Sequence, residues 1–163
     1  MDLAALEEIR QLKYRYFRTL DLKRWDEFAD TLANDIVAEY GTHALSDPLI
    51  FEGRDALAGF MSKTLGSAIT TVHIANHPEI TVTGDTATGS WCFEDTVIVP
   101  DAKSLIRGAG YYSDEYRRDE DGRWRITRTS YARIYESLVS LEDIPSHRFL
   151  SHMWATGTTT PQP

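Results

Sequence analysis

Four polar residues attract notice because each stands within, or directly after, a run of apolar positions: Tyr16, Asp21, His73 and Arg133. A histidine titrates near neutral pH and serves as a general base, and a carboxylate beside it fixes its tautomer and stabilises its protonated form. A tyrosine hydroxyl donates a proton or a hydrogen bond, and an arginine stabilises developing negative charge. These residue types together indicate acid/base catalysis.

Each of these residues also has a structural interpretation, and the sequence leaves both open. Tyr16 fits a core tyrosine with its hydroxyl at the rim, and Asp21 fits the N-cap of a following helix. His73 fits a buried, hydrogen-bonded side chain, and Arg133 fits a surface charge or an interface ion pair. His77 competes with His73 for the role of base, but it precedes a proline at an expected bend, so we favour His73.

The first part of the chain is predicted to supply the helices. Apolar residues recur every three or four positions over residues 3–20 and form one stripe, which consists of Leu3, Leu6, Ile9, Leu12, Tyr16 and Leu20. Lys13 is expected on the opposite, polar side of this helix. Apolar spacing further predicts a short helix from Trp25 to Leu32, a strand over 36–40, and a third helix that opens at Phe51 and stops at Gly66.

From residue 69 onward the apolar period changes from 3.6 to 2 and predicts four strands, over residues 69–82, 86–99, 104–118 and 123–136. Gly84-Asp85 and Asp121-Gly122 indicate tight turns between neighbours, and Pro78 indicates a break in the first of these strands. Strands joined by short turns form an antiparallel meander. Helices followed by such strands predict an α+β fold, with the helices on one face of a curved antiparallel sheet.

Composition excludes several classes of protein. The chain has 163 residues, with 17 basic and 25 acidic side chains and a formal charge of −8, which argues against nucleic-acid binding and against an anionic membrane surface. Its one cysteine excludes a disulfide framework and a cysteine-rich zinc site. No dinucleotide, phosphate-loop or zinc-protease motif occurs. We therefore expect no metal and no organic cofactor. The N-terminal residues show no signal peptide, and a cytoplasmic location is expected.

The order and spacing of several fragments resemble the SnoaL-like group of the nuclear transport factor 2-like superfamily, over roughly residues 3–136. The fragments are Thr71-Val72-His73-Ile74-Ala75-Asn76, Gly84-Asp85-Thr86-Ala87, Gly122-Arg123-Trp124-Arg125-Ile126 and Tyr131-Ala132-Arg133-Ile134-Tyr135-Glu136. The resemblance implies a conical α+β barrel, in which three N-terminal helices and a curved antiparallel sheet enclose a pocket. The superfamily includes dehydratases, isomerases, polyketide cyclases and a dehydrochlorinase, as well as non-catalytic small subunits of ring-hydroxylating dioxygenases.

Within that superfamily the sequence is most similar to the branch of bile-acid dehydratase, scytalone dehydratase and lindane dehydrochlorinase. Asp21 matches the aspartate that follows the first helix there, and His73 matches its strand histidine. Tyr16 falls five positions before the aspartate, where the bile-acid enzyme has tyrosine, and Arg133 matches a late strand arginine. Leu20 stands where scytalone dehydratase has a tyrosine, which argues against a scytalone-type site.

We therefore expect an elimination or isomerisation at a carbon made acidic by a neighbouring carbonyl, with His73 as base and Asp21 as its partner. The substrate is expected to be a small hydrophobic cyclic molecule, derived from a steroid, polyketide or aromatic compound. Its binding surface is expected to include Phe17, Phe60, Trp91, Phe93 and Tyr112. A polyketide-type cyclase is one alternative, and a non-catalytic ligand-binding or assembly domain is another.

The domain is expected to span residues 1–136, with a C-terminal extension over 137–163. Residues 137–155 carry Phe149, Leu150, Met153 and Trp154, and such apolar mass predicts docking over the pocket mouth or on a neighbour. Residues 156–163 are predicted to form a loose tail. Because the exposed face of such a sheet is expected to pack on another subunit, we predict a homodimer or homotrimer.

Overall fold

The computed structural model describes residues 2–41 and 47–154. Its helices are α1 (Leu3–Asp21), α2 (Trp25–Asp30) and α3 (Arg54–Thr64). Its strands are β1 (Leu32–Tyr40), β2 (Leu49–Glu52), β3 (Thr70–Thr83), β4 (Thr86–Val99), β5 (Ser104–Arg118) and β6 (Trp124–Ser140), and a 3-10 turn follows at Leu141–Asp143. The predicted tail over residues 156–163 lies outside the described part of the chain.

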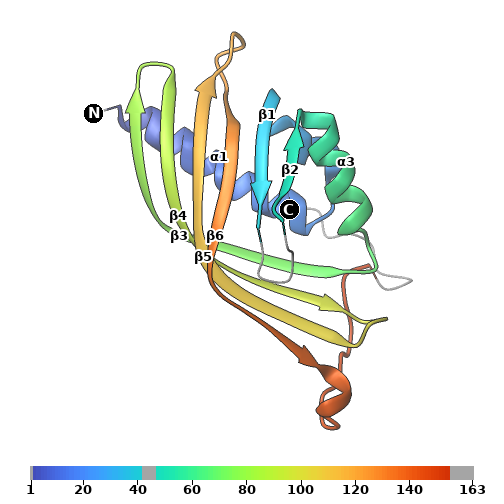
Figure 1. The fold of residues 1–163 in the computed structure, drawn as a ribbon. Helices are drawn as coiled ribbons and strands as arrows, with labels where there is room; N and C mark the ends of the chain where they lie inside the picture. The colour runs from blue at the N-terminus through green and yellow to red at the C-terminus, as the bar shows by residue number, and fades with distance from the viewer. Residues whose placement is uncertain (1, 42–46, 155–163) are drawn as a thin grey trace.

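One six-stranded sheet, in the order β2-β1-β6-β5-β4-β3, forms the body of the protein. Strands β3–β6 bend strongly along their length, and the sheet does not close on itself (Figure 1). Helix α1 crosses the sheet over one half of these strands, while α3 lies beside β1 and β2 (Figure 1). The predicted α+β fold is confirmed. The sheet is not wholly antiparallel, however, because β1 pairs with β6 in parallel.

The four strands of the meander agree closely with the alternation in the sequence. Strands β4 and β5 have the predicted bounds, and β6 continues to Ser140 because Ser140 pairs with Ser104 at the start of β5. The expected break at Pro78 is a bulge inside a continuous β3, since the pairing register shifts between Asn76 and Glu79. His77, within this bulge, has a positive φ of 49°.

The predicted start of the third helix at Phe51 is wrong. Residues 49–52 pair with β1 as strand β2, and Phe51 stands opposite Ala38. Gly53 follows with a φ of 92°, a left-handed conformation that turns the chain into α3 at Arg54. Phe51 still packs against the helix, since its ring centroid lies 4.5 Å from that of Phe60.

The position of Lys13 is a second correction. The sequence suggested the polar face of α1, but the side chain is fully buried. Residue 13 lies four positions after Ile9 and four before Phe17, so it shares their face of the helix. The buried face of α1 is therefore wider than the apolar stripe, and it contains a charge.

Candidate active site

Asp21 and His73 are brought together by the end of α1 and the edge strand β3. Nδ1 of His73 lies 2.7 Å from Oδ1 of Asp21, and the backbone N–H of His73 donates to Oδ2 at 2.8 Å. An ionised carboxylate only accepts hydrogen bonds, so Nδ1 carries the proton and Nε2 keeps its lone pair. The pair therefore has the geometry of an oriented general base.

The structural interpretation of Asp21 as the N-cap of the following helix is wrong, because Asp21 does not cap α2. The N-cap of α2 is Arg24, which makes no side-chain capping bond. The carboxylate of Asp21 instead accepts hydrogen bonds from β3, including that of the Thr71 hydroxyl at 2.8 Å. Because β3 is the edge of the sheet, Asp21 also satisfies a strand N–H that no neighbouring strand can reach.

The imidazole of His73 is packed but not sealed. The ring of Phe17 stacks on it with a centroid separation of 5.4 Å and an interplanar angle of 6°. Side-chain exposure is 10% for His73 and 17% for Asp21. The pair is therefore partly exposed, and the stacking with Phe17 holds the imidazole in one orientation.

Arg133 lies on the same side of the sheet, held by two carboxylates. Its two terminal nitrogens donate to Asp95 at 2.9 and 2.6 Å, and Nε lies 3.0 Å from Glu136. Burial alone would lower the pKa of Arg133, but Asp95, with smaller contributions from Tyr131 and Glu136, raises it above its usual value. Arg133 is thus always charged, and its charge is compensated.

Strand pairing explains why this cluster lies near the histidine. His73 stands opposite Asp95, Asp95 opposite Gly108, and Gly108 opposite Glu136, which forms one row across β3–β6. A side chain at Gly108 would collide with the guanidinium of Arg133. The glycine that the sequence shows inside β5 therefore leaves the space that Arg133 occupies.

Tyr16 is fully buried and does not project alone into open space. Its hydroxyl lies 2.8 Å from that of Tyr40, and the ring of Tyr40 stacks on Tyr131 at 5.3 Å. The ring centroid of Tyr131 in turn lies 5.2 Å from the guanidinium carbon of Arg133. Burial raises the pKa of Tyr16 and of Tyr40 above the usual value, so both hydroxyls stay protonated, and one of them donates to the other.

The five predicted lining residues separate into two groups. Phe17, Phe93 and Tyr112 form one aromatic cluster. The ring centroid of Tyr112 lies 5.5 Å from that of Phe17 and 4.8 Å from that of Phe93. This cluster connects the His73 side of the site with the Arg133 side. Phe60 packs on Phe51 at α3 instead, and the fully buried Trp91 donates from Nε1 to the hydroxyl of Tyr116 at 2.8 Å.

A second buried charge pair escaped the sequence analysis. Nζ of Lys13 lies 2.7 Å from Oδ2 of Asp114, which also accepts hydrogen bonds from Tyr116 and Thr129, each at 2.7 Å. Burial lowers the pKa of Lys13, and Asp114 opposes that shift. The alternation of Tyr112, Asp114 and Tyr116 along β5 was the signal that could have placed Asp114 inside. The alternation of Phe93 and Asp95 along β4 was the equivalent signal for Asp95.

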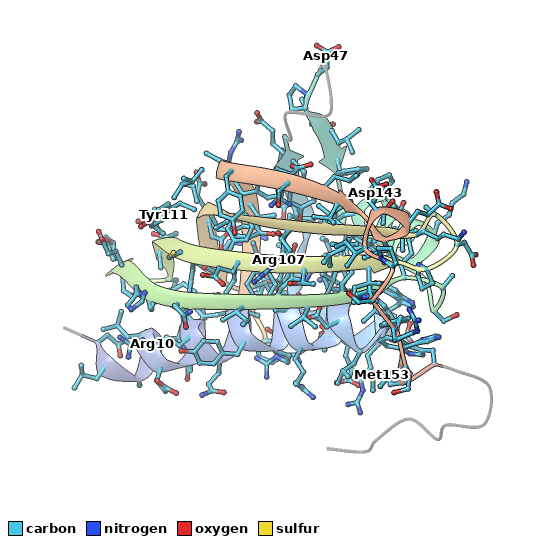
Figure 2. The ribbon with its side chains drawn as sticks, turned by 90° about the horizontal axis from the view of Figure 1, so that it is seen from below. Arg10, Asp47, Arg107, Tyr111, Asp143 and Met153 are labelled. Atoms are coloured by element: carbon cyan, nitrogen blue, oxygen red, sulfur yellow. The ribbon has the colours of Figure 1, made fainter. Side chains whose placement is uncertain are left out.

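The C-terminal segment returns to the end of α1. Figure 2 shows the chain passing from Asp143, beyond β6, to Met153 beside the C-terminal end of α1. The ring of Trp154 lies 5.3 Å from Nζ of Lys23, and Nζ donates to the hydroxyl of Thr71 at 2.9 Å. Part of the extension thus lies next to the groups that hold Asp21.

Residues 2–41 and 47–154 contain no group of three or more His, Cys, Asp and Glu side chains arranged to hold a metal ion. In the same residues no helix is long and apolar enough to cross a membrane.

A curved, open sheet with helices against it is the α+β fold of the nuclear transport factor 2-like proteins. The profile of the SnoaL-like domain matches residues 1–130, and the chain therefore belongs to the SnoaL-like family.

Solved structures of the same fold include two dehydrochlorinases. A type 2 hexachlorocyclohexane dehydrochlorinase superposes with a TM-score of 0.71 at 18% identity, covering 84% of this chain and 90% of its own. The type 3 enzyme from Novosphingobium barchaimii gives 0.74 at 14% identity, with coverages of 92% and 97%. A scytalone dehydratase-like protein from Novosphingobium aromaticivorans gives 0.73 at 19% identity, with coverages of 83% and 88%. At these identities the likeness shows the fold.

Proposed function

We propose that the chain is a cofactor-independent acid/base enzyme, a lyase of the dehydratase type or an isomerase, acting on a small cyclic substrate. The observation that carries this proposal is the contact of 2.7 Å between Asp21 and Nδ1 of His73, which leaves Nε2 as a base. Two of the structures with this fold are dehydrochlorinases, which supports an elimination.

In the proposed reaction, Nε2 of His73 takes a proton from a carbon next to a carbonyl. In an elimination, the electrons of the broken C–H bond form a carbon–carbon double bond, and the leaving group departs with the electrons of its own bond. In a dehydration the imidazolium returns the proton to the leaving hydroxyl, which releases water. In an isomerisation no group leaves: the electrons of the C–H bond form an enolate with the carbonyl, and the imidazolium returns the proton to another carbon. Asp21 stabilises the imidazolium between these steps.

The aromatic cluster of Phe17, Phe93 and Tyr112 supports a cyclic, largely apolar substrate, because flat rings pack well against aromatic faces. Tyr16 and Arg133 are proposed as hydrogen-bond donors to a substrate oxygen. Since Asp95 and Glu136 compensate the charge of Arg133, we assign it a donor role rather than the capture of a free anion.

Turnover of a panel of cyclic hydroxy-ketones by His73→Ala, with His77→Ala as the matched control, tests the proposal. Loss of the catalytic base is expected to lower kcat/KM by about 10²–10⁴-fold. The exposed His77 is expected to be dispensable. Equal activity of His73→Ala and the unmodified protein would show that the pair is not the catalytic centre. Product mass separates the reaction classes, because dehydration loses water, whereas isomerisation and the cyclase alternative need not.

The non-catalytic alternative predicts a different outcome of the same experiment. It predicts that no substrate of the panel is turned over, and co-purification with a larger iron–sulfur oxygenase subunit would favour its assembly form over passive ligand binding.

The face of the sheet turned away from α1 carries exposed apolar side chains, among them Val72, Ile74, Tyr111 and Tyr135. We propose that this face packs against another copy of the chain in a homodimer or homotrimer. Light scattering after size-exclusion chromatography tests this, and a mass near 18.5 kDa would contradict it.

A further inference from the structure

Lys23 occupies an unusual backbone position beside the Asp21–His73 pair. The end of α1 is a Schellman motif, in which Lys23 N–H bonds the carbonyl of Leu20 at 3.2 Å and Arg24 N–H bonds that of Thr19 at 2.8 Å. Glycine is preferred where Lys23 stands, because the residue there is left-handed, and Lys23 has a φ of 58°. A lysine at this position carries a conformational cost, which suggests that its side chain has a role.

The side chain of Lys23 leads to the catalytic histidine through one hydroxyl. Nζ donates to Oγ1 of Thr71 at 2.9 Å, and Oγ1 donates to Oδ1 of Asp21 at 2.8 Å. The same Oδ1 holds Nδ1 of His73 at 2.7 Å. These directions are fixed by chemistry, because an ammonium has no acceptor, a carboxylate has no donor, and a hydroxyl has one proton to give.

The surroundings of this chain of hydrogen bonds are partly screened from water. Thr71 is only 2% exposed, and the ring of Trp154 lies 5.3 Å from Nζ of Lys23. Burial lowers the pKa of Lys23 to about 8, and Asp21 opposes that shift. Lys23 therefore remains charged through the pH range in which a histidine usually titrates.

We propose that Lys23 and Thr71 are positioning residues that bias the protonation of the Asp21–His73 pair. The positive charge of Lys23 acts on the carboxylate and disfavours a second positive charge on the imidazole. The assignment of His73 as the catalytic base rests on the proposed function. The electrostatic effect of Lys23 on the imidazole is independent of that function.

Other charges face the same histidine. Asp21 comes from α1, Asp95 stands opposite on β4, and Arg133 and Glu136 follow on β6. Asp95 and Glu136 are both paired with Arg133, so this side of the site keeps its charge in any variant of Lys23. A shift in the titration of His73 after substitution of Lys23 therefore reports on Lys23.

NMR titration of the imidazole signals tests the proposal without a substrate, with His73→Gln used to assign the signal of His73. Lys23→Met and Thr71→Val are expected to raise the titration midpoint of His73 by about 0.5–1 pH unit, as loss of a nearby partly exposed charge does. Lys23→Arg and Thr71→Ser keep the charge and the hydroxyl, so both are expected to retain the original midpoint. Lys63→Met, at an exposed site on α3, is the matched control.

Lys23→Gly separates charge from structure. It removes the ammonium but supplies the residue that the left-handed position prefers, so it is expected to fold well and still raise the midpoint. An unchanged midpoint in both Lys23→Gly and Lys23→Met would overturn the proposal.

The pH profile of kcat/KM is the second measurement, and its acidic limb is expected to move in parallel with the NMR midpoint. A moved NMR midpoint with an unmoved kinetic limb would support the positioning pair and contradict His73 as the base. The double variant Lys23→Met/Thr71→Val is expected to shift the midpoint no further than the larger single variant, because both act along one path. A fully additive shift would contradict that path.

Discussion

The protein contains two lysine–aspartate clusters between α1 and the sheet, and they differ in how far they are closed. Lys13 and Asp114 have no exposed side-chain surface, and Asp114 also accepts hydrogen bonds from two hydroxyls. The cluster of Lys23, Asp21 and His73 stays partly exposed and ends at an imidazole nitrogen.

Position along α1 accounts for the difference. Residue 13 lies in the middle of the helix, over the centre of the sheet, whereas residue 21 is the last helical residue and meets the edge strand. The same pair of residue types thus serves packing where the helix covers it on all sides. Where the helix ends at the edge strand, the cluster stays partly exposed, and there we propose that it serves catalysis.

The closed cluster is expected to give the largest effect on stability. Lys13→Met leaves Asp114 as an uncompensated buried charge, which costs about 3–5 kcal/mol of unfolding free energy. Urea denaturation measures the loss, with Lys63→Met as the exposed control. If the buried pair contributed no more than a surface pair, both variants would unfold at the same urea concentration, and the contrast between the clusters would disappear.

The open cluster is expected to respond in activity instead. Asp21→Asn keeps the shape of the side chain but presents a donor to Nδ1, which favours the wrong tautomer of His73 and is expected to lower kcat by about 10²-fold or more. Asp26→Asn, on the exposed side of α2, is the control. Full activity in Asp21→Asn would mean that the carboxylate does not orient the base.

A third variant probes the Arg133 side of the site. Gly108→Ala places a methyl group against the guanidinium of Arg133 and 3.0 Å from Asp95, and such overpacking costs about 1–3 kcal/mol. Gly59→Ala is the matched control, because nothing lies within 4 Å of its added carbon and alanine favours a helix. Comparison of the two urea midpoints measures the effect, and equal midpoints would show that Arg133 moves aside without cost.

The sequence predicted the strands better than the charges. Alternation placed β4 and β5 to the residue, because each strand has one face buried and one face exposed. The closeness of Asp21 and His73 was expected from resemblance to a family. The apolar spacing of α1 does not reveal that Lys13 is buried, because a buried charge depends on a partner, Asp114, that lies far away in sequence.

Arg133 is a second residue whose ion-pair partners could not be predicted from the sequence. Its residue type suggested a catalytic cation, a surface charge or an interface ion pair, and the sequence did not identify its two carboxylate partners, which come from another strand and from a position three residues onward. The guanidinium lies over Gly108, and only the pairing of β5 with β6 reveals that arrangement. The partners of the ion pairs could therefore be identified only from the three-dimensional structure, whereas the strands that carry these residues could be predicted from the sequence.

The smallest expected effect concerns the cover over the open cluster. Trp154→Leu removes the aromatic face beside Lys23 but keeps an apolar side chain, and an exposed cation–π contact contributes about 0.5–1 kcal/mol. More water then reaches the ammonium, so the lowered pKa of Lys23 is expected to rise toward its usual value.

In the unmodified protein the unfolded chain binds more protons at this lysine between pH 8 and its ordinary pKa of 10.5, so its contribution to stability rises with pH across that window. Trp154→Leu is expected to flatten that rise, measured as the difference in unfolding free energy from Lys23→Met at each pH. A rise as steep as before would show that burial by the helix end and β3, rather than Trp154, sets the protonation of Lys23.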